Sequence, residues 1–174
     1  QGILHVTNPG RHRVETYSRE GELLGTWGQM APAPGGFYGC CNPSFLALLA
    51  DGRFVTSSKG YREVNLYDAT GQFLATIAGT TALGGWQAGL AGHAPTGITQ
   101  AGTGDPCPVA VDSRGLVYVA GSEGDVYLRA FDATGALAFN LATEELTYAP
   151  DRLVVTPRDV LYALDGQKVC EFRR

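Results

Sequence analysis

The chain has 174 residues, 44% of them hydrophobic and 17% charged, so it can form one domain with a core, and disorder is not expected. A net charge of −4 argues against a nucleic-acid-binding protein, which usually needs a basic face. No apolar run approaches the roughly 18 residues that a membrane span requires, and the opening QGILHV is no signal peptide.

The chain repeats a pattern of two short alternating apolar and polar segments that flank a polar turn ending in glycine. This alternation predicts two antiparallel strands joined by a tight hairpin. Glycine accepts the positive φ that such a turn needs at little cost. The hairpins begin at Val14, Val64 and Leu128, and their turn glycines are Gly21, Gly71 and Gly135.

A second repeated pattern precedes each hairpin, in which a strand meets another strand through a short turn. It reads GILHVTN from Gly2, FLALLADGRFVTS from Phe45, VAVDSRGLVYVAG from Val109 and LVVTPRDVLYALD from Leu153. Together the two patterns make a unit of four short antiparallel strands, about forty residues long, which is typical of a β-propeller blade. We therefore expect an all-β fold.

The units cover residues 1–29, 43–79, 106–143 and 150–174 of a single domain. The first unit lacks its inner strand and the last ends after three strands, so two blades are complete and two incomplete. About fourteen strands result, against roughly twenty-four in a closed six-bladed ring. We expect about half a propeller, whose open flanks expose apolar faces and strand edges that a protein partner covers.

Two insertions interrupt the strand pattern. The longer, residues 79–106, is rich in glycine and alanine and low in charge, which suits burial against a partner; an unstructured insertion is the alternative. A shorter one precedes the first complete blade. The residues that we expect to bind a partner are Trp86, Leu90 and His93 in the longer insertion and Tyr38 in the shorter one.

Three cysteines, Cys40, Cys41 and Cys107, precede inner strands and are expected near one end of the propeller axis. They can form a vicinal Cys40–Cys41 disulfide, a bridge from Cys107 to one of the pair, a site for copper, zinc or an iron–sulfur cluster, or buried thiols. Adjacent residues in an extended segment point in opposite directions, which disfavours a shared metal, so we favour a structural disulfide. A vicinal pair also favours an oxidising compartment.

The order of these repeated sequence segments resembles that in the NHL-repeat family of β-propellers. Residues 109–135 match its pattern most fully, and residues 3–21 and 48–71 follow it in part. The motif GCCNP at residues 39–43 is similar to one found before an inner strand in bacterial NHL-like proteins. The resemblance implies the fold and a shared structural element, and it implies no particular activity because propellers host many.

No nucleophile motif, phosphate-binding loop or pair of carboxylates stands out, and no histidine precedes an inner strand. We therefore expect no catalytic residues, no cofactor and no metal. The predicted function is a non-catalytic protein-binding scaffold, an accessory subunit of a periplasmic or secreted assembly whose leader is not in this chain. Attachment to a membrane complex stays open. The alternatives are a cysteine-based redox or soft-metal module, and a hydrolase or lyase with an axial metal.

Overall fold

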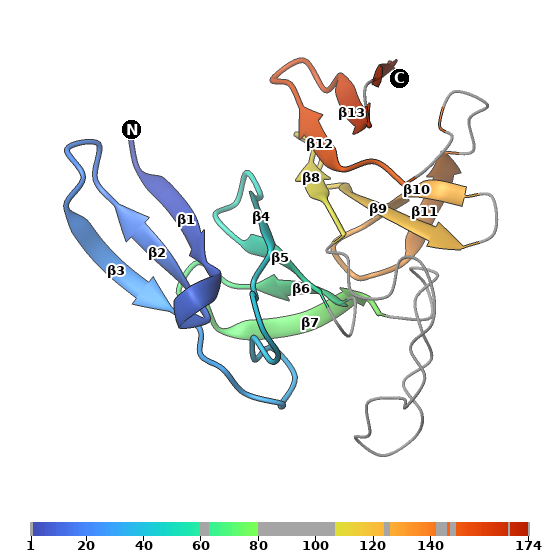
Figure 1. Ribbon diagram of the computed structural model, residues 1–174. Helices are drawn as coiled ribbons and strands as arrows, with labels where there is room; N and C mark the ends of the chain where they lie inside the picture. Colours follow the sequence, from blue (N-terminus) through green and yellow to red (C-terminus); the bar gives the residue numbers. More distant parts are fainter. Residues whose placement is uncertain are drawn as a thin grey trace.

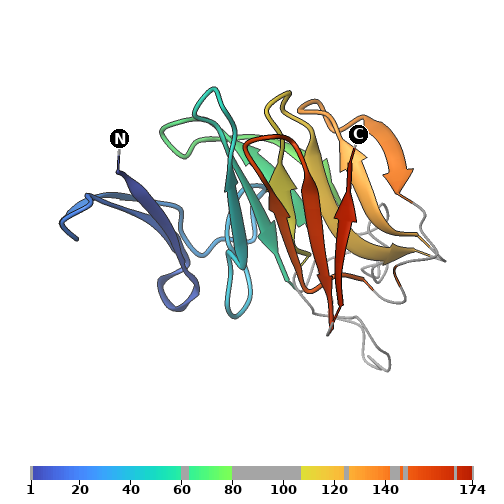
Figure 2. The ribbon, with the colours of Figure 1, turned by 90° about the horizontal axis from the view of Figure 1, so that it is seen from above.

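The computed structural model describes residues 2–59, 63–79, 107–123, 126–141, 146, 149–166 and 168–173. Within these ranges, fourteen strands form four antiparallel sheets that follow one another as blades along an open arc (Figure 1). Figure 2 shows the same blades from above. The predicted all-β fold, with two four-stranded and two three-stranded blades, is confirmed.

Each blade is a meander of consecutive strands. The first blade has β1 (Leu4–Asn8), β2 (Arg13–Tyr17) and β3 (Leu23–Trp27), with a short 3-10 turn at Pro9–Arg11 between its first two strands. The second has β4 (Phe45–Leu48), β5 (Phe54–Ser58), β6 (Glu63–Tyr67) and β7 (Phe73–Ala78). The third has β8 (Val109–Val111), β9 (Val117–Glu123), β10 (Val126–Phe131) and β11 (Leu137–Leu141), and the last has β12 (Arg152–Val155), β13 (Leu161–Asp165) and β14 (Lys168–Phe172).

The hairpin turns of the two complete blades are built by an aspartate. Asp68 accepts hydrogen bonds from the backbone N–H groups of Thr70 and Gln72, at 2.8 and 2.9 Å, and Asp132 repeats this with Thr134 and Ala136. The hydroxyl of the threonine in each turn lowers the pKa of its aspartate. The DATG sequence therefore sets each turn locally, before any blade packs.

Apolar side chains fill the spaces between neighbouring blades and form three clusters. The cluster between the first two blades contains buried Val14, Phe37, Phe54 and Tyr67, and Trp27 packs on it. β-branched residues fill the next space, among them Val55, Val64, Val117 and Val119. The last contains Leu128, Leu153, Leu161 and Ala163. Each blade thus buries apolar side chains against its neighbours.

The outer faces of the two end blades carry exposed apolar side chains. On the first blade, Leu4 is 57% exposed opposite Tyr17, and on the last, Val154 is 58% exposed opposite Tyr162. No described residue forms a helix long and apolar enough to cross a membrane. A partner that covers the outer faces stays a prediction.

Candidate functional site

The starts of the inner strands meet at one end of the blades. β4, β8 and β12 lie side by side, and a backbone hydrogen bond ties the entry of each to the next strand of its blade. The Ser44 N–H donates to the backbone oxygen of Ser57 at 2.8 Å, and the Asp151 N–H donates to the backbone oxygen of Leu164 at 2.7 Å. We call the entry residues Ser44, Cys107 and Asp151, with the first residues of β4 and β12, the axial mouth.

An arginine spans this axial mouth. The guanidinium carbon of Arg152, at the start of β12, lies 5.0 Å from the ring centre of Phe45, at the start of β4. Nη1 of the same guanidinium donates to the backbone oxygen of Asp151 at 2.6 Å. The cation thus contacts an aromatic face and a carbonyl while its side chain stays exposed. A fixed guanidinium at the axis can bind a carbonyl or carboxylate oxygen of a ligand.

Asn42 fixes the approach to the first complete blade. Its side chain is fully buried, and its amide nitrogen donates to the backbone oxygens of Tyr38 and Lys59, at 2.6 and 3.1 Å. Its amide oxygen accepts from Lys59 N–H at 2.8 Å and from the Ser44 hydroxyl at 3.3 Å. One side chain therefore joins the connection before β4 to the end of β5. The peptide bond between Asn42 and Pro43 is cis.

The structure places the near-axis cysteines in two environments. Cys40 and Cys41 are exposed and form no disulfide in the structure, and Cys41 has a positive φ of 67°. Cys107 is 2% exposed and packs in the cluster between the second and third blades. Among the described residues, no three His, Cys, Asp or Glu side chains could together hold a metal ion. The disulfide stays a prediction.

The two histidines that the structure describes, His5 and His12, belong to the first blade and contact residues outside it. The His5 ring lies edge-on to Phe54, with ring centres 4.9 Å apart, and its Nδ1 is 3.0 Å from the Thr16 hydroxyl. Burial lowers the pKa of His5. His12 Nδ1 donates to the backbone oxygen of Phe37 at 3.0 Å, so this histidine anchors the connection after β3.

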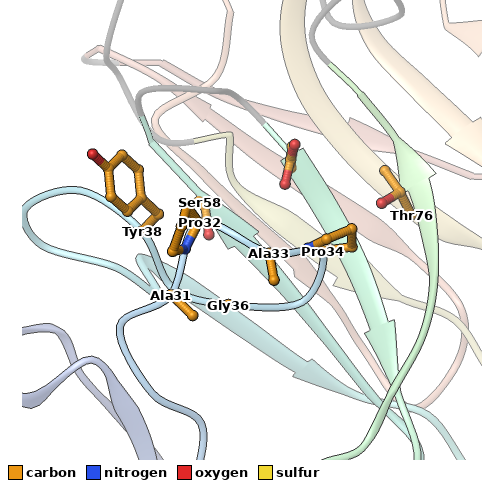
Figure 3. A pocket seen from close by; sticks show the side chains of 9 residues that line it. Ala31, Pro32, Ala33, Pro34, Gly36, Tyr38, Ser58 and Thr76 are labelled. Carbon is orange, nitrogen blue, oxygen red and sulfur yellow. The ribbon is translucent and has the colours of Figure 1, made fainter. Parts of the chain in front are cut away.

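That connection, residues 28–44, lines a pocket of about 220 Å³ together with residues of β5, β6 and β7 in the second blade (Figure 3). Tyr38, one of the expected partner-binding residues, lines this pocket and is 41% exposed. The other three, Trp86, Leu90 and His93, lie outside the described residues. The pocket is also lined by Ala31, Pro32, Ala33, Pro34, Gly36, Ser58, Glu63 and Thr76.

Sequence reasoning singled out Tyr38 of the pocket, but neither Arg152 nor Ser58, Glu63 and Thr76. Arg152 reaches Phe45 only because β12 and β4 flank β8, which no local pattern reveals. The role of Asn42 could have been suspected from the sequence, because GCCNP places a short polar side chain between a cysteine pair and a proline.

The fold is shared with solved structures of enzymes. A streptogramin B lyase matches with a TM-score of 0.58 and 12% identity over 99% of this chain and 51% of its own. Virginiamycin B lyase from Staphylococcus aureus, solved with quinupristin, matches with a TM-score of 0.58 and 12% identity, over 98% of this chain and 54% of the lyase. A gluconolactonase from Xanthomonas campestris matches with a TM-score of 0.62 and 18% identity, over 98% of this chain and 55% of the lactonase. No family model and no curated protein matches the chain.

The chain forms about half of a β-propeller-like fold. It spans about half the length of the solved structures that it matches. At these identities the likeness shows the fold alone, and it does not distinguish NHL repeats from other propeller repeats.

The predicted non-catalytic scaffold is corrected by these comparisons, because the matching structures are lyases and a lactonase. The prediction relied on the lack of a catalytic motif and of histidines before inner strands. Side chains from several blades meet at a propeller axis, so one stretch of half a ring need not contain a recognisable motif. The alternative of a hydrolase or lyase fits the comparisons better than the scaffold does.

Proposed function

We propose that the chain forms about half of a propeller enzyme, a hydrolase or lyase whose substrate binds at the axial mouth. The observation that carries this proposal is the shared fold with a streptogramin B lyase and a gluconolactonase over nearly the whole chain. The exposed, oriented guanidinium of Arg152 supports it independently, because it gives the axial mouth a group that can act on a substrate oxygen.

In this proposal Arg152 binds the carbonyl oxygen of a substrate ester. In hydrolysis, water adds to the carbonyl carbon, negative charge grows on the carbonyl oxygen, and the C–O bond to the alcohol then breaks as the alcohol oxygen takes a proton. The Arg152 guanidinium stabilises that charge. Phe45 and the Asp151 backbone oxygen hold the guanidinium from two sides.

An axial metal accompanied the hydrolase or lyase prediction, and the described residues do not fit one. The axial mouth offers the Asp151 carboxylate, the Ser44 hydroxyl and the buried thiol of Cys107, and no described group of three His, Cys, Asp or Glu side chains could hold an ion. We therefore derive no step through a metal.

Membership of the NHL-repeat family and an extracytoplasmic location belong to the same proposal. The pattern in residues 109–135 supports the former, and the adjacent Cys40 and Cys41 support the latter. Fractionation of cells that make the native protein tests the location: recovery in the cytoplasm contradicts it.

The activity is tested by incubating the full-length protein with quinupristin and with gluconolactone and analysing the products by mass spectrometry. A hydrolase product gains the mass of water, whereas a lyase product keeps the mass of its substrate. We expect turnover of at least one compound, and a loss of about 100-fold in kcat for Arg152→Ala. Arg158→Ala, which removes an exposed arginine from a turn of the same blade, is the matched control. No turnover of either compound, or equal rates for both variants, overturns the proposal.

A further inference from the structure

We propose that the pocket between the 28–44 connection and the second blade binds a small primary amine. This site lies on strands β5, β6 and β7, apart from the starts of the inner strands that form the axial mouth. The proposal does not depend on the proposed function, because it rests on the polar groups and the shape of this pocket alone.

A buried hydroxyl without a partner is the first observation. Ser58, the last residue of β5, is 6% exposed, and its Oγ is buried and makes no hydrogen bond in the structure. Ser58 lines the pocket (Figure 3). An unsatisfied buried hydroxyl is costly and uncommon in native proteins, so a ligand that donates a hydrogen bond to it relieves that cost.

A carboxylate stands next to this hydroxyl. Glu63 is paired with Ser58 across β5 and β6, so both side chains project from the same face of the blade. Oε2 of Glu63 accepts a long hydrogen bond of 3.4 Å from the amide of Asn65, and its Oε1 accepts none from the described residues. The amide oxygen of Asn65 in turn accepts from the Thr76 hydroxyl at 2.8 Å. The network orients Glu63 and leaves one of its oxygens for a ligand.

The opposite wall is apolar and fixed in place. It consists of Ala31, Pro32, Ala33 and Pro34, which line the pocket from the 28–44 connection (Figure 3). The wall is anchored by the Tyr67 hydroxyl, which donates to the backbone oxygen of Gly35 at 3.0 Å, and by the fully buried ring of Phe37. The pocket is therefore formed before a ligand arrives, which reduces the entropy cost of binding.

These groups select the chemistry of the ligand. A primary ammonium has three donors and no acceptor, so it can pair with the Glu63 carboxylate and donate to the Ser58 hydroxyl beside it. No described residue that lines the pocket is cationic, so nothing there competes for the carboxylate. A calcium ion needs six to eight oxygen ligands, more than one carboxylate and a few hydroxyls provide. A volume of about 220 Å³ admits an amine with a short apolar stem.

The test is titration calorimetry of the full-length protein with butylammonium, butyrate and 1-butanol, which share a stem and differ in the head group. We expect butylammonium alone to bind measurably. Glu63→Gln keeps the shape and the Asn65 contact while removing the charge, and should weaken binding about tenfold or more. Glu20→Gln, in an exposed hairpin turn, is the matched control and should leave the affinity unchanged.

Ser58→Ala separates a ligand role from a structural one. It removes the unsatisfied hydroxyl, so the melting temperature of the ligand-free protein should stay level or rise while the affinity for butylammonium falls about tenfold. The proposal is overturned if the wild-type protein does not bind butylammonium, if butanol or butyrate binds as tightly, or if Glu63→Gln keeps the affinity of the wild type.

Discussion

Replacing Asn42 with alanine should cost more stability than the small change in side-chain volume implies. The variant removes three part-buried hydrogen bonds between the Asn42 side chain and the backbone, namely those to the carbonyls of Tyr38 and Lys59 and from the N–H of Lys59. At about 1 kcal/mol for each lost bond, the free energy of unfolding should fall by about 3 kcal/mol. For a chain of this length, that corresponds to a melting temperature lower by about 6–12 °C.

Urea unfolding followed by tryptophan fluorescence measures this loss, because Trp27 packs on Phe37 of the 28–44 connection with ring centres 5.8 Å apart. Ser44→Ala is the matched control. It removes only the hydroxyl bonds to the Cys41 carbonyl and to Asn42, at 3.1 and 3.3 Å, and should cost less than about 1 kcal/mol. Equal losses for the two variants would refute the reasoning that one buried amide holds the connection to β5.

Two further predictions concern charge and backbone shape. Hydrogen bonds from the Tyr17 hydroxyl, the larger cause, and from Arg13 lower the pKa of Glu15 from 4.5 to about 2. The ionised Glu15 carboxylate therefore stabilises the fold fully above pH 4.5, and this stabilisation is lost as the pH falls toward 2. Melts across this range should show the advantage of the wild type over Glu15→Gln shrinking, and an undiminished advantage at pH 2 contradicts this. Gly71→Ala should destabilise by about 2 kcal/mol more than Gly21→Ala, because both have positive φ but only at Gly71 would the new Cβ lie 2.3 Å from the Trp27 ring. Equal urea midpoints for these two variants would count against the clash.

The strands and hairpins could be predicted because their determinants are local. Alternation of apolar and polar residues marks each strand, and the Asp-Ala-Thr-Gly turns form from hydrogen bonds within five residues. The incomplete end blades also followed from the pattern, since the repeat shows that the first unit lacks its inner strand and that the last has only three strands.

The sites could not be predicted in the same way, because they depend on neighbours distant in sequence. Arg152 meets Phe45 only when three inner strands lie side by side, and Ser58 meets Glu63 only in the register of β5 with β6. The burial of Cys107 likewise depends on Val55 and Val64 of the preceding blade, so a cysteine before a strand can be a core residue. The function was predicted wrongly because a motif search assumes that the catalytic residues lie within one stretch of chain.

In the 28–44 connection, different residues stabilise the fold and line the pocket. Its stability comes from Phe37, from Asn42 and from backbone groups, whereas Pro32, Ala33 and Pro34 face the pocket and contribute little to the core. Exchanges at those three positions can therefore alter what the pocket accepts without weakening any strand. In evolutionary terms, selection can change the ligand preference of this blade and its folding separately, which makes the connection a favourable place to engineer new specificity.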